Sequence, residues 1–266
     1  MSYLDEGHGD EAIVMLHGNP TWSFYYRNLV LGLRGKIRCI VPDHLGCGLS
    51  DKPQGFDYTL GEHTKNLRAL LDSLKLRKIH LIVHDWGGPI GLGAALAKPE
   101  QLGRVVILNT ASFADAQLPW RIRLCRIPRL SEWLVRVLNG FAWPATRMAV
   151  TKPLSPDVKR GFLFPYNNWA NRIATHRFVQ DIPMGKGSAS DLALAEVERK
   201  LVILRDRPVR ILWGGQDFCF NRHYYNRWRV ILPGANADYF TEAGHYVLED
   251  AGQECLQQIQ EFLNLA

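Results

Sequence analysis

Three residues that could form a hydrolytic site each follow a short apolar run typical of a buried strand. Asp85 comes after the first run, Asp217 follows the run 209–213, and His245 follows the run 237–241. A nucleophile, a supporting acid and a histidine base occur in this order along the chain of one large group of hydrolytic enzymes. Three such residues at three strand ends point to chemistry more strongly than any one of them.

The stretch around Asp85 indicates which nucleophile to expect. Residues 83–87 read Val-His-Asp-Trp-Gly, and the pattern of a strand, a sharp turn and a small-residue helix is that of a nucleophile elbow. The usual elbow carries serine where this chain has Asp85. A carboxylate needs no base to activate it, and it can displace a leaving group from an alkyl carbon to form an ester. The alternative is that Asp85 caps the helix that follows.

His245 and Asp217 would complete the reaction. Asp217 would hold the imidazole in the right tautomer, so that His245 can deprotonate a water molecule that cleaves the ester. The alternatives are a hydrogen-bonded loop histidine for His245 and a turn residue after Gly-Gly for Asp217. Asn109 ends the preceding strand, where an acid could also stand, but an amide cannot take that role.

Asn19 and Trp86 are candidates for stabilising an anion. Each follows a predicted strand, so their backbone N–H groups can form an oxyanion hole. Their side chains, an amide and an indole, each offer a neutral N–H donor, which suits a departing anion such as a halide. The alternatives are a core aromatic role for Trp86 and a loop role before proline for Asn19.

These residues need a parallel sheet to bring them together. Strands are predicted at 11–16, 37–41, 79–83, 105–108, 209–213 and 237–241, and helices at 24–33, 60–74, 87–98, 189–204, 222–231 and 252–265. Strands alternating with helices at this spacing predict a mostly parallel, doubly wound α/β sheet with right-handed crossovers. The carboxyl ends of such strands are where these sheets build their sites.

The alternation stops after about residue 112, where a helical insertion rich in tryptophan and arginine begins. We therefore predict a core at 1–113 and 188–266, interrupted by a helical cap at 114–187. Residues 118–178 hold eleven Lys and Arg against two acidic residues, a net charge of +9 that leaves −3 for the rest of the chain. Such a segment suits an anionic lipid surface, a nucleic acid or an acidic partner, or it is a solvated face. The absence of a nucleic-acid motif leads us to expect no nucleic acid as a partner.

Composition sets the remaining expectations. The chain has 266 residues, of which 47% are hydrophobic and 22% charged, an ordinary globular balance. The N-terminus lacks a secretory pattern, and the five cysteines are odd in number and never in C-x-x-C spacing, which predicts a cytoplasmic protein with reduced thiols. Neither a dinucleotide fingerprint nor metal-ligand spacing is present, so we expect no cofactor and no metal.

With these residues in view, the chain resembles the haloalkane dehalogenases. The resemblance rests on His-Gly-Asn-Pro at 17–20, on Val-His-Asp-Trp-Gly at 83–87, and on Asp217 and His245. The Asn19 and Trp86 pair, with an acid at Asp217, is the pattern of that group's third subfamily, and residues 42–53 match as well. The cap stretches 169–174 and 177–183 look like the β-lactone decarboxylases of bacterial long-chain olefin biosynthesis, which overlap with that subfamily.

The resemblance implies an α/β-hydrolase fold with a helical cap inserted after the sixth family strand, and no cofactor. It implies a small lipophilic substrate for which two reactions stay open. The first is hydrolytic dehalogenation through an Asp85 ester, and the alternative is decarboxylation of a cis-3-alkyl-4-alkyloxetan-2-one (a β-lactone) to a cis-alkene and carbon dioxide. A catalytically silent, ligand-binding relative is the third possibility, and the basic cap suits self-association or a multi-enzyme assembly. The family usually carries an extra strand pair before the His17 loop, so the sheet edge is expected to be short or completed by a neighbouring subunit.

Overall fold

Seven strands form one sheet in the computed structural model. The structure describes residues 1–115, 117–127 and 129–265. Positions 116, 128 and 266, which belong to the predicted domain ranges, lie outside the described residues. The strand order is β1-β3-β2-β4-β5-β6-β7. All neighbouring strands are parallel except β1, which pairs antiparallel with β3. The strands are β1 (Tyr3–Glu6), β2 (Glu11–Leu16), β3 (Arg38–Pro42), β4 (Lys78–Val83), β5 (Leu102–Ile107), β6 (Val209–Gly214) and β7 (Asn236–Phe240).

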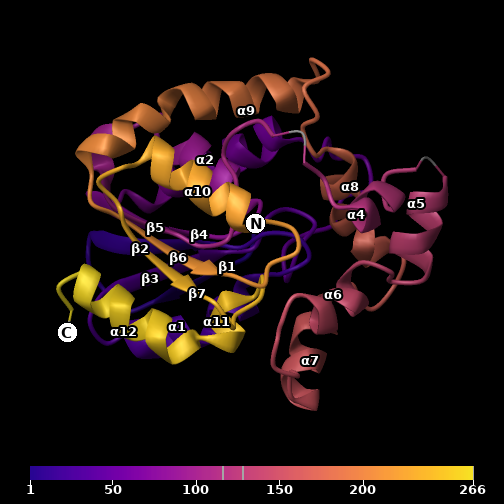
Figure 1. Ribbon diagram of the computed structural model, residues 1–266, viewed down its shortest axis with the longest axis horizontal. Helices are drawn as coiled ribbons and strands as arrows, with labels where there is room; N and C mark the ends of the chain where they lie inside the picture. Colours follow the sequence, from indigo (N-terminus) through magenta and orange to yellow (C-terminus); the bar gives the residue numbers. More distant parts are fainter. Residues whose placement is uncertain (116, 128, 266) are drawn as a thin grey trace.

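Helices cover both faces of this sheet, so the core has two halves (Figure 1). Along β2, Ile13 and Met15 contact one half, while Ala12 and Val14 contact the other, as the two-residue period of a strand requires. One face packs against α1 (Arg27–Leu33), α11 (Val247–Asp250) and α12 (Gly252–Phe262). The other packs against α2 (Leu60–Leu74), α3 (Gly87–Ala95), α9 (Ala189–Lys200) and α10 (Arg222–Ile231). This is the doubly wound α/β-hydrolase fold predicted from the sequence.

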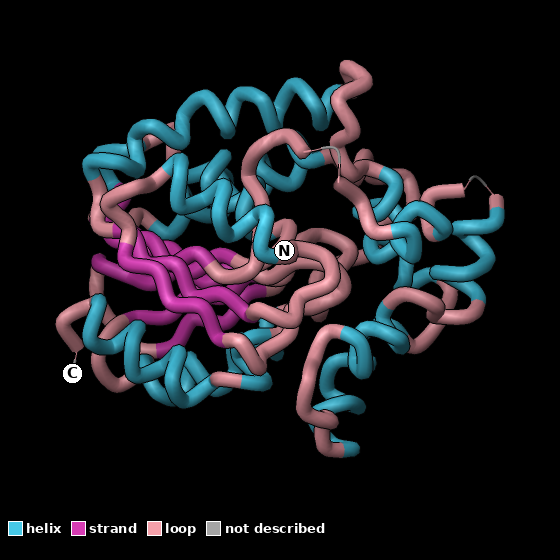
Figure 2. Tube along the Cα trace, viewed as in Figure 1, coloured by secondary structure: helices cyan, strands magenta, loops and turns pink. Residues whose placement is uncertain are grey.

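The described part of the segment between β5 and α9 consists of helices joined by loops, and it lies beyond the carboxyl ends of the strands (Figure 2). Loops that follow the strands lie between it and the sheet. Its elements are α4 (Trp120–Leu124), α5 (Leu130–Glu132), a π-helical turn (Trp133–Val137), α6 (Ala142–Met148), α7 (Pro156–Leu163), two 3-10 turns (Phe164–Tyr166 and Ala170–Arg172) and α8 (Ile173–Gln180). We call residues 114–187 the cap.

Local structure departs from the sequence-based expectation at a few places. β1 was not predicted, because Tyr-Leu-Asp-Glu is short and largely exposed and has no buried face to reveal it. It forms the sheet edge, paired with β3 from Tyr3 opposite Pro42. The helix expected at 24–33 begins with a 3-10 turn at Ser23–Tyr26, and the one expected at 189–204 ends as a 3-10 segment at Leu201–Asp206. Among the described helices, none combines the length and the apolar composition that a membrane crossing requires.

Candidate active site

Asp85 stands on a sharp turn between β4 and α3, as expected for a nucleophile elbow. Its φ of +50° lies in the left-handed region, where aspartate is better tolerated than most residues. Gly87 and Gly88, at the start of α3, must be small, because a Cβ on Gly87 would lie 2.0 Å from the Leu16 carbonyl oxygen, and one on Gly88 equally close to the Thr110 hydroxyl. That hydroxyl donates a hydrogen bond to the Asp85 carbonyl oxygen, which fixes the turn against the end of β5.

Two backbone N–H groups hold the Asp85 carboxylate. The N–H of Asn19 donates to Oδ1 at 2.6 Å, and the N–H of Trp86 also donates to the carboxylate. Asn19 can come this close because Gly18 has no side chain; a Cβ there would meet Oδ1 at 2.0 Å. Burial raises the pKa of Asp85, while the neighbouring His245 and the two N–H donors oppose that rise. The N–H groups predicted to form an oxyanion hole therefore already hold a negative oxygen.

His245 lies between the two carboxylates. Its Nδ1 is 2.7 Å from Oδ2 of Asp217, and its Nε2 is 3.9 Å from Oδ2 of Asp85. A carboxylate only accepts hydrogen bonds, so Nδ1 carries the proton and the Nε2 lone pair faces the nucleophile. Burial would lower the pKa of His245, but the Asp217 charge and hydrogen bond, with the Asp85 charge, raise it above the ordinary value. The structure thus brings the three residues together as predicted, with His245 between Asp217 and Asp85.

Asp217 is held by more partners than the sequence suggested. Its Oδ1 accepts the backbone N–H groups of Cys219 at 2.6 Å and Phe220 at 3.0 Å. Its Oδ2 accepts an N–H of the Asn109 amide at 3.0 Å besides the imidazole. Asn109, set aside because an amide cannot be the acid, therefore positions the acid. With four donors, the carboxylate is fixed in position next to His245.

His84 contacts His245, and the sequence did not reveal this contact. It is fully buried, and its Nε2 lies 2.9 Å from the carbonyl oxygen of His245. The two imidazole rings pack with their centroids 4.4 Å apart. Its position directly before the nucleophile was the available signal. The contacts indicate that His84 supports the backbone and ring of His245.

The side chains of Asn19 and Trp86 both line the same cavity as Asp85 and His245. One Asn19 amide N–H donates to the carbonyl oxygen of Thr175 on α8 at 3.1 Å, which leaves its second N–H for a ligand. The Trp86 indole packs on Phe178 of α8, with the ring centroids 5.1 Å apart. Both donors are therefore oriented by the cap helix that covers them.

A cavity of about 340 Å³ lies between the sheet and the cap, above Asp85. This volume is within the roughly 300–1,000 Å³ typical of pockets for small ligands. Its walls are mostly apolar and come from both sides, including Leu60, Phe113, Ile122, Phe141, Met148 and Val179. Besides Asp85, His245 and the donors beside them, the charged or amide side chains in its lining are Asp115, Gln117 and Arg121. Because most of the remaining wall is apolar, the site suits a lipophilic electrophile.

Comparison of the sequence with known proteins identifies relatives of this chain. The sequence profile of the alpha/beta hydrolase fold family matches residues 11–252. The chain is 46% identical, over 99% of its length and 85% of the relative's, to a cis-3-alkyl-4-alkyloxetan-2-one decarboxylase of Shewanella oneidensis. It is 44% identical to the protein of that name from Xanthomonas campestris, over 99% and 92% of the two chains.

More distant relatives carry a different name. Haloalkane dehalogenase 2 of Mycobacterium tuberculosis is 31% identical over 94% of this chain and 86% of its own length. Among solved structures, a haloalkane dehalogenase from Agrobacterium tumefaciens superposes with a TM-score of 0.88 at 24% identity, covering 99% of this chain and 92% of that one. This last likeness supports the fold alone.

Proposed function

The chain is an enzyme of the alpha/beta hydrolase fold family, in the group that holds haloalkane dehalogenases and β-lactone decarboxylases, and from that premise we propose that it decarboxylates lipophilic cis-β-lactones. In this proposal Asp85 is the nucleophile, and the products are a cis-alkene and carbon dioxide. The observation that carries this proposal is a partly buried carboxylate, held by two N–H groups, at the floor of a largely apolar cavity.

Relatives guide the choice between two reactions that the same residues support. The relatives at 46% and 44% identity are named for the β-lactone, whereas the one at 31% is named for the haloalkane. The apolar walls suit a ring that carries two alkyl groups and no charge. These observations favour the decarboxylation, which the sequence left as the alternative.

The reaction can be written with Asp85 alone as the covalent partner. The Asp85 carboxylate attacks the alkyl-substituted ring carbon that is bonded to the ring oxygen, and a new C–O bond forms there. The bond from that carbon to the ring oxygen breaks, so the former lactone group leaves as a substrate carboxylate. The bond between the neighbouring carbon and that carboxylate then breaks, and its electron pair becomes the C=C bond. The pair of the Asp85 ester bond returns to Asp85, so carbon dioxide and alkene leave and no water is consumed.

The geometry of the product follows from these two steps. Displacement at carbon inverts the configuration, which puts the Asp85 oxygen and the new carboxylate on opposite sides of the C–C bond. Loss of both groups from that anti arrangement turns a cis ring into a cis-alkene. His245 and Asp217 have no water to activate here, so we propose that they hold Asp85 oriented and charged.

A direct comparison of substrates tests the proposal. The purified protein is offered a cis-3,4-dialkyl β-lactone and a bromoalkane of similar length in separate assays, following alkene, carbon dioxide and bromide. We expect cis-alkene with a kcat/KM above that for bromide release. Bromide release alone, with the lactone unchanged, would contradict the proposed function.

Dehalogenation is a second candidate function, favoured by the donors beside Asp85. The Trp86 indole N–H has no acceptor among the described residues, and one Asn19 amide N–H is free, so two neutral donors remain for a halide. Asp85 would displace the halide, and water activated by His245 would cleave the ester. In this reaction His245 is an obligatory base.

We expect Trp86→Phe to slow bromide release while the protein stays folded. Phenylalanine keeps a ring against Phe178 but removes the N–H donor to the leaving anion. Loss of one such donor costs about 10²–10³ in kcat. Bromide release in a stopped-flow assay measures the effect, and Trp133→Phe, an exposed cap residue outside the cavity, is the matched control. An unchanged rate in Trp86→Phe would contradict the halide site.

The two steps of dehalogenation should respond differently to pH. The pKa of His245 is raised above 6.5, so the imidazole gains a proton, and loses its base function, at a higher pH than a free histidine would. Steady-state bromide release should therefore fall as the pH drops through that raised pKa. The first bromide needs only an ionised Asp85, and it should persist to lower pH. If release of the first bromide and steady-state bromide release had the same pH profile, these roles of Asp85 and His245 would be contradicted.

A further inference from the structure

Exposed apolar side chains are concentrated on the cap. Of the eighteen large apolar side chains that are exposed among the described residues, eleven belong to it, although the cap is the smaller part of the chain. All the exposed tryptophans are among them, with Trp120 at 65% and Trp143 at 46% exposure. We call this set the cap apolar surface: Trp120, Leu124, Ile127, Leu130, Trp133, Val137, Leu138, Trp143, Met148, Phe164 and Trp169.

Basic side chains are interleaved with these tryptophans. The Arg121 guanidinium lies 5.2 Å from the ring centroid of Trp120, and that of Arg147 lies 4.7 Å from Trp143. Lys159 also approaches the Trp143 ring, at 5.8 Å. The net charge of +9 over residues 118–178, against −3 elsewhere, concentrates the positive potential here. Tryptophan with arginine or lysine around it is the composition that sits at a membrane–water interface.

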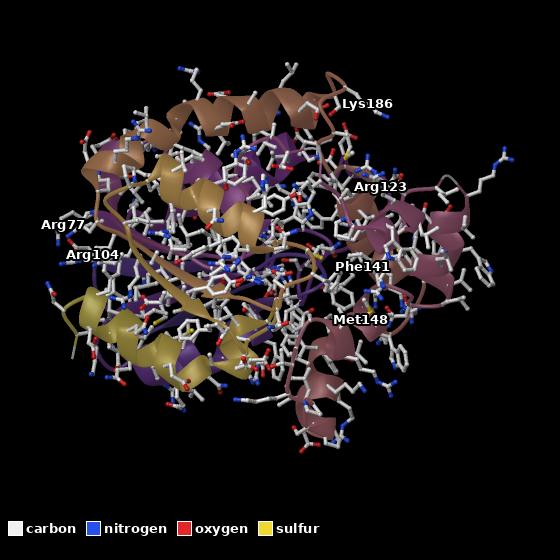
Figure 3. The ribbon with its side chains drawn as sticks, in the orientation of Figure 1. Arg77, Arg104, Arg123, Phe141, Met148 and Lys186 are labelled. Atoms are coloured by element: carbon white, nitrogen blue, oxygen red, sulfur yellow. The ribbon has the colours of Figure 1, made fainter. Side chains whose placement is uncertain are left out.

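The same elements also form the cavity wall. On α4, Arg121 and Ile122 line the cavity, while Trp120 and Leu124 are exposed to solvent. Met148, at the end of α6, lines the cavity and is itself 37% exposed. Phe141 and Met148 lie at the boundary between the cap and the loops that follow the strands (Figure 3). Apolar surface therefore continues from the outside of the cap to the space above Asp85.

We propose that the cap docks on an anionic lipid surface, from which lipophilic substrates pass between α4 and α6 into the cavity. The docking rests on the exposed tryptophans and the charge. The passage of substrate rests in addition on the proposed function, since dialkyl lactones and alkenes dissolve in lipid rather than in water. A protein partner would use similar side chains, but the continuity of the surface with an apolar cavity favours a lipid phase.

Vesicle flotation tests the docking without any assay of activity. The full chain is mixed with vesicles of phosphatidylcholine alone or of phosphatidylcholine with phosphatidylglycerol. We expect flotation with the anionic vesicles only. We also expect release in about 1 M salt, where the screening length falls to ~3 Å. Equal behaviour with both vesicle types would contradict the electrostatic part of the proposal.

A charge variant locates the contact. Arg123→Gln, Arg147→Gln and Lys159→Gln together remove three charges from side chains that do not line the cavity. At ~1 kcal/mol for each basic residue near the surface, the partition coefficient should fall about 100-fold. The matched control is Arg68→Gln, Arg199→Gln and Arg229→Gln, exposed positions on core helices α2, α9 and α10. An equal loss in both triple variants would overturn the assignment to the cap.

Insertion of the exposed tryptophans into the lipid can be measured by fluorescence quenching. Lipids brominated in the acyl chain should quench the fluorescence of the wild-type protein. The quenching should be much smaller in Trp120→Ser/Trp143→Ser, whose side chains lie outside the cavity. Unchanged quenching in this variant would overturn the role of the cap apolar surface.

Failure of the docking can be told from failure of the proposed function. Alkene formation from a short-chain lactone, assayed without vesicles, should be the same in the cap triple variant and the wild type. Alkene formation with no flotation would contradict the docking alone, and flotation with no alkene would contradict the decarboxylation alone. A dimer or larger assembly that the cap triple variant abolishes, with no vesicle binding, would mean that this surface contacts protein and would overturn the proposal.

Discussion

Replacing Asp85 by asparagine should abolish both alkene formation from a β-lactone and bromide release from a bromoalkane. The amide is neutral and cannot form the ester on which either reaction depends. Removal of a covalent nucleophile typically costs 10⁴-fold or more in kcat. Asparagine tolerates the positive φ of this position, and its oxygen can still accept the N–H of Asn19, so the elbow should keep its shape.

The measurement is the initial rate of each reaction, with the melting temperature as a check on folding. Asp51→Asn, at an exposed position outside the cavity, is the matched control and should behave as the wild type. A folded Asp85→Asn protein with near wild-type rates would show that another group attacks the substrate.

Replacing His245 by alanine should separate the two reactions. With a bromoalkane, the Asp85 ester should form once and then persist, because the base that activates water is absent. General base catalysis contributes about 10²–10⁴-fold, so turnover should fall by that factor while one bromide per site is still released. With a β-lactone, no water is needed, and alkene formation should fall far less.

Intact-protein mass spectrometry measures the trapped ester as a protein heavier by the alkyl group. His245→Gln keeps an N–H donor for Asp217 and serves as a second variant if alanine unsettles the buried pair, and His8→Ala, at an exposed position, is the matched control. Repeated bromide release without an adduct would contradict the role of His245 as the hydrolytic base. Equal loss of both reactions would mean that alkene formation also needs proton transfer by the imidazole.

The fold class could be predicted because parallel strands buried on both faces are continuous apolar runs, and these are easy to recognise. The runs at 11–16, 79–83 and 209–213 have this form and became central strands. β1 could not be predicted, since a short edge strand with Asp5 and Glu6 exposed or half-exposed has no such run. Its pairing with β3 depends on a partner more than thirty residues away, which local pattern cannot show.

The site was predictable where motif and topology coincide. Asp85 follows a strand inside a recognisable elbow, and Asp217 and His245 follow strands that end at the same edge of the sheet. The sequence could not show that Asn109 supports Asp217, or that His84 supports His245, because these contacts join loops that are far apart in the chain. Nor could it show that Thr175 and Phe178 of the cap orient the two anion donors.

Heavy-oxygen labelling tests the central claim, that Asp85 opens the lactone and leaves again without water. The protein turns over a cis-β-lactone in water labelled with heavy oxygen, and the peptide that contains Asp85 is then weighed. A bromoalkane in the same water is the control, because hydrolysis of its ester leaves label in the Asp85 carboxylate. We predict cis-alkene, carbon dioxide and an unlabelled Asp85 from the lactone. A labelled Asp85, together with a hydroxy acid in place of the alkene, would contradict this account and make the protein a lactone hydrolase.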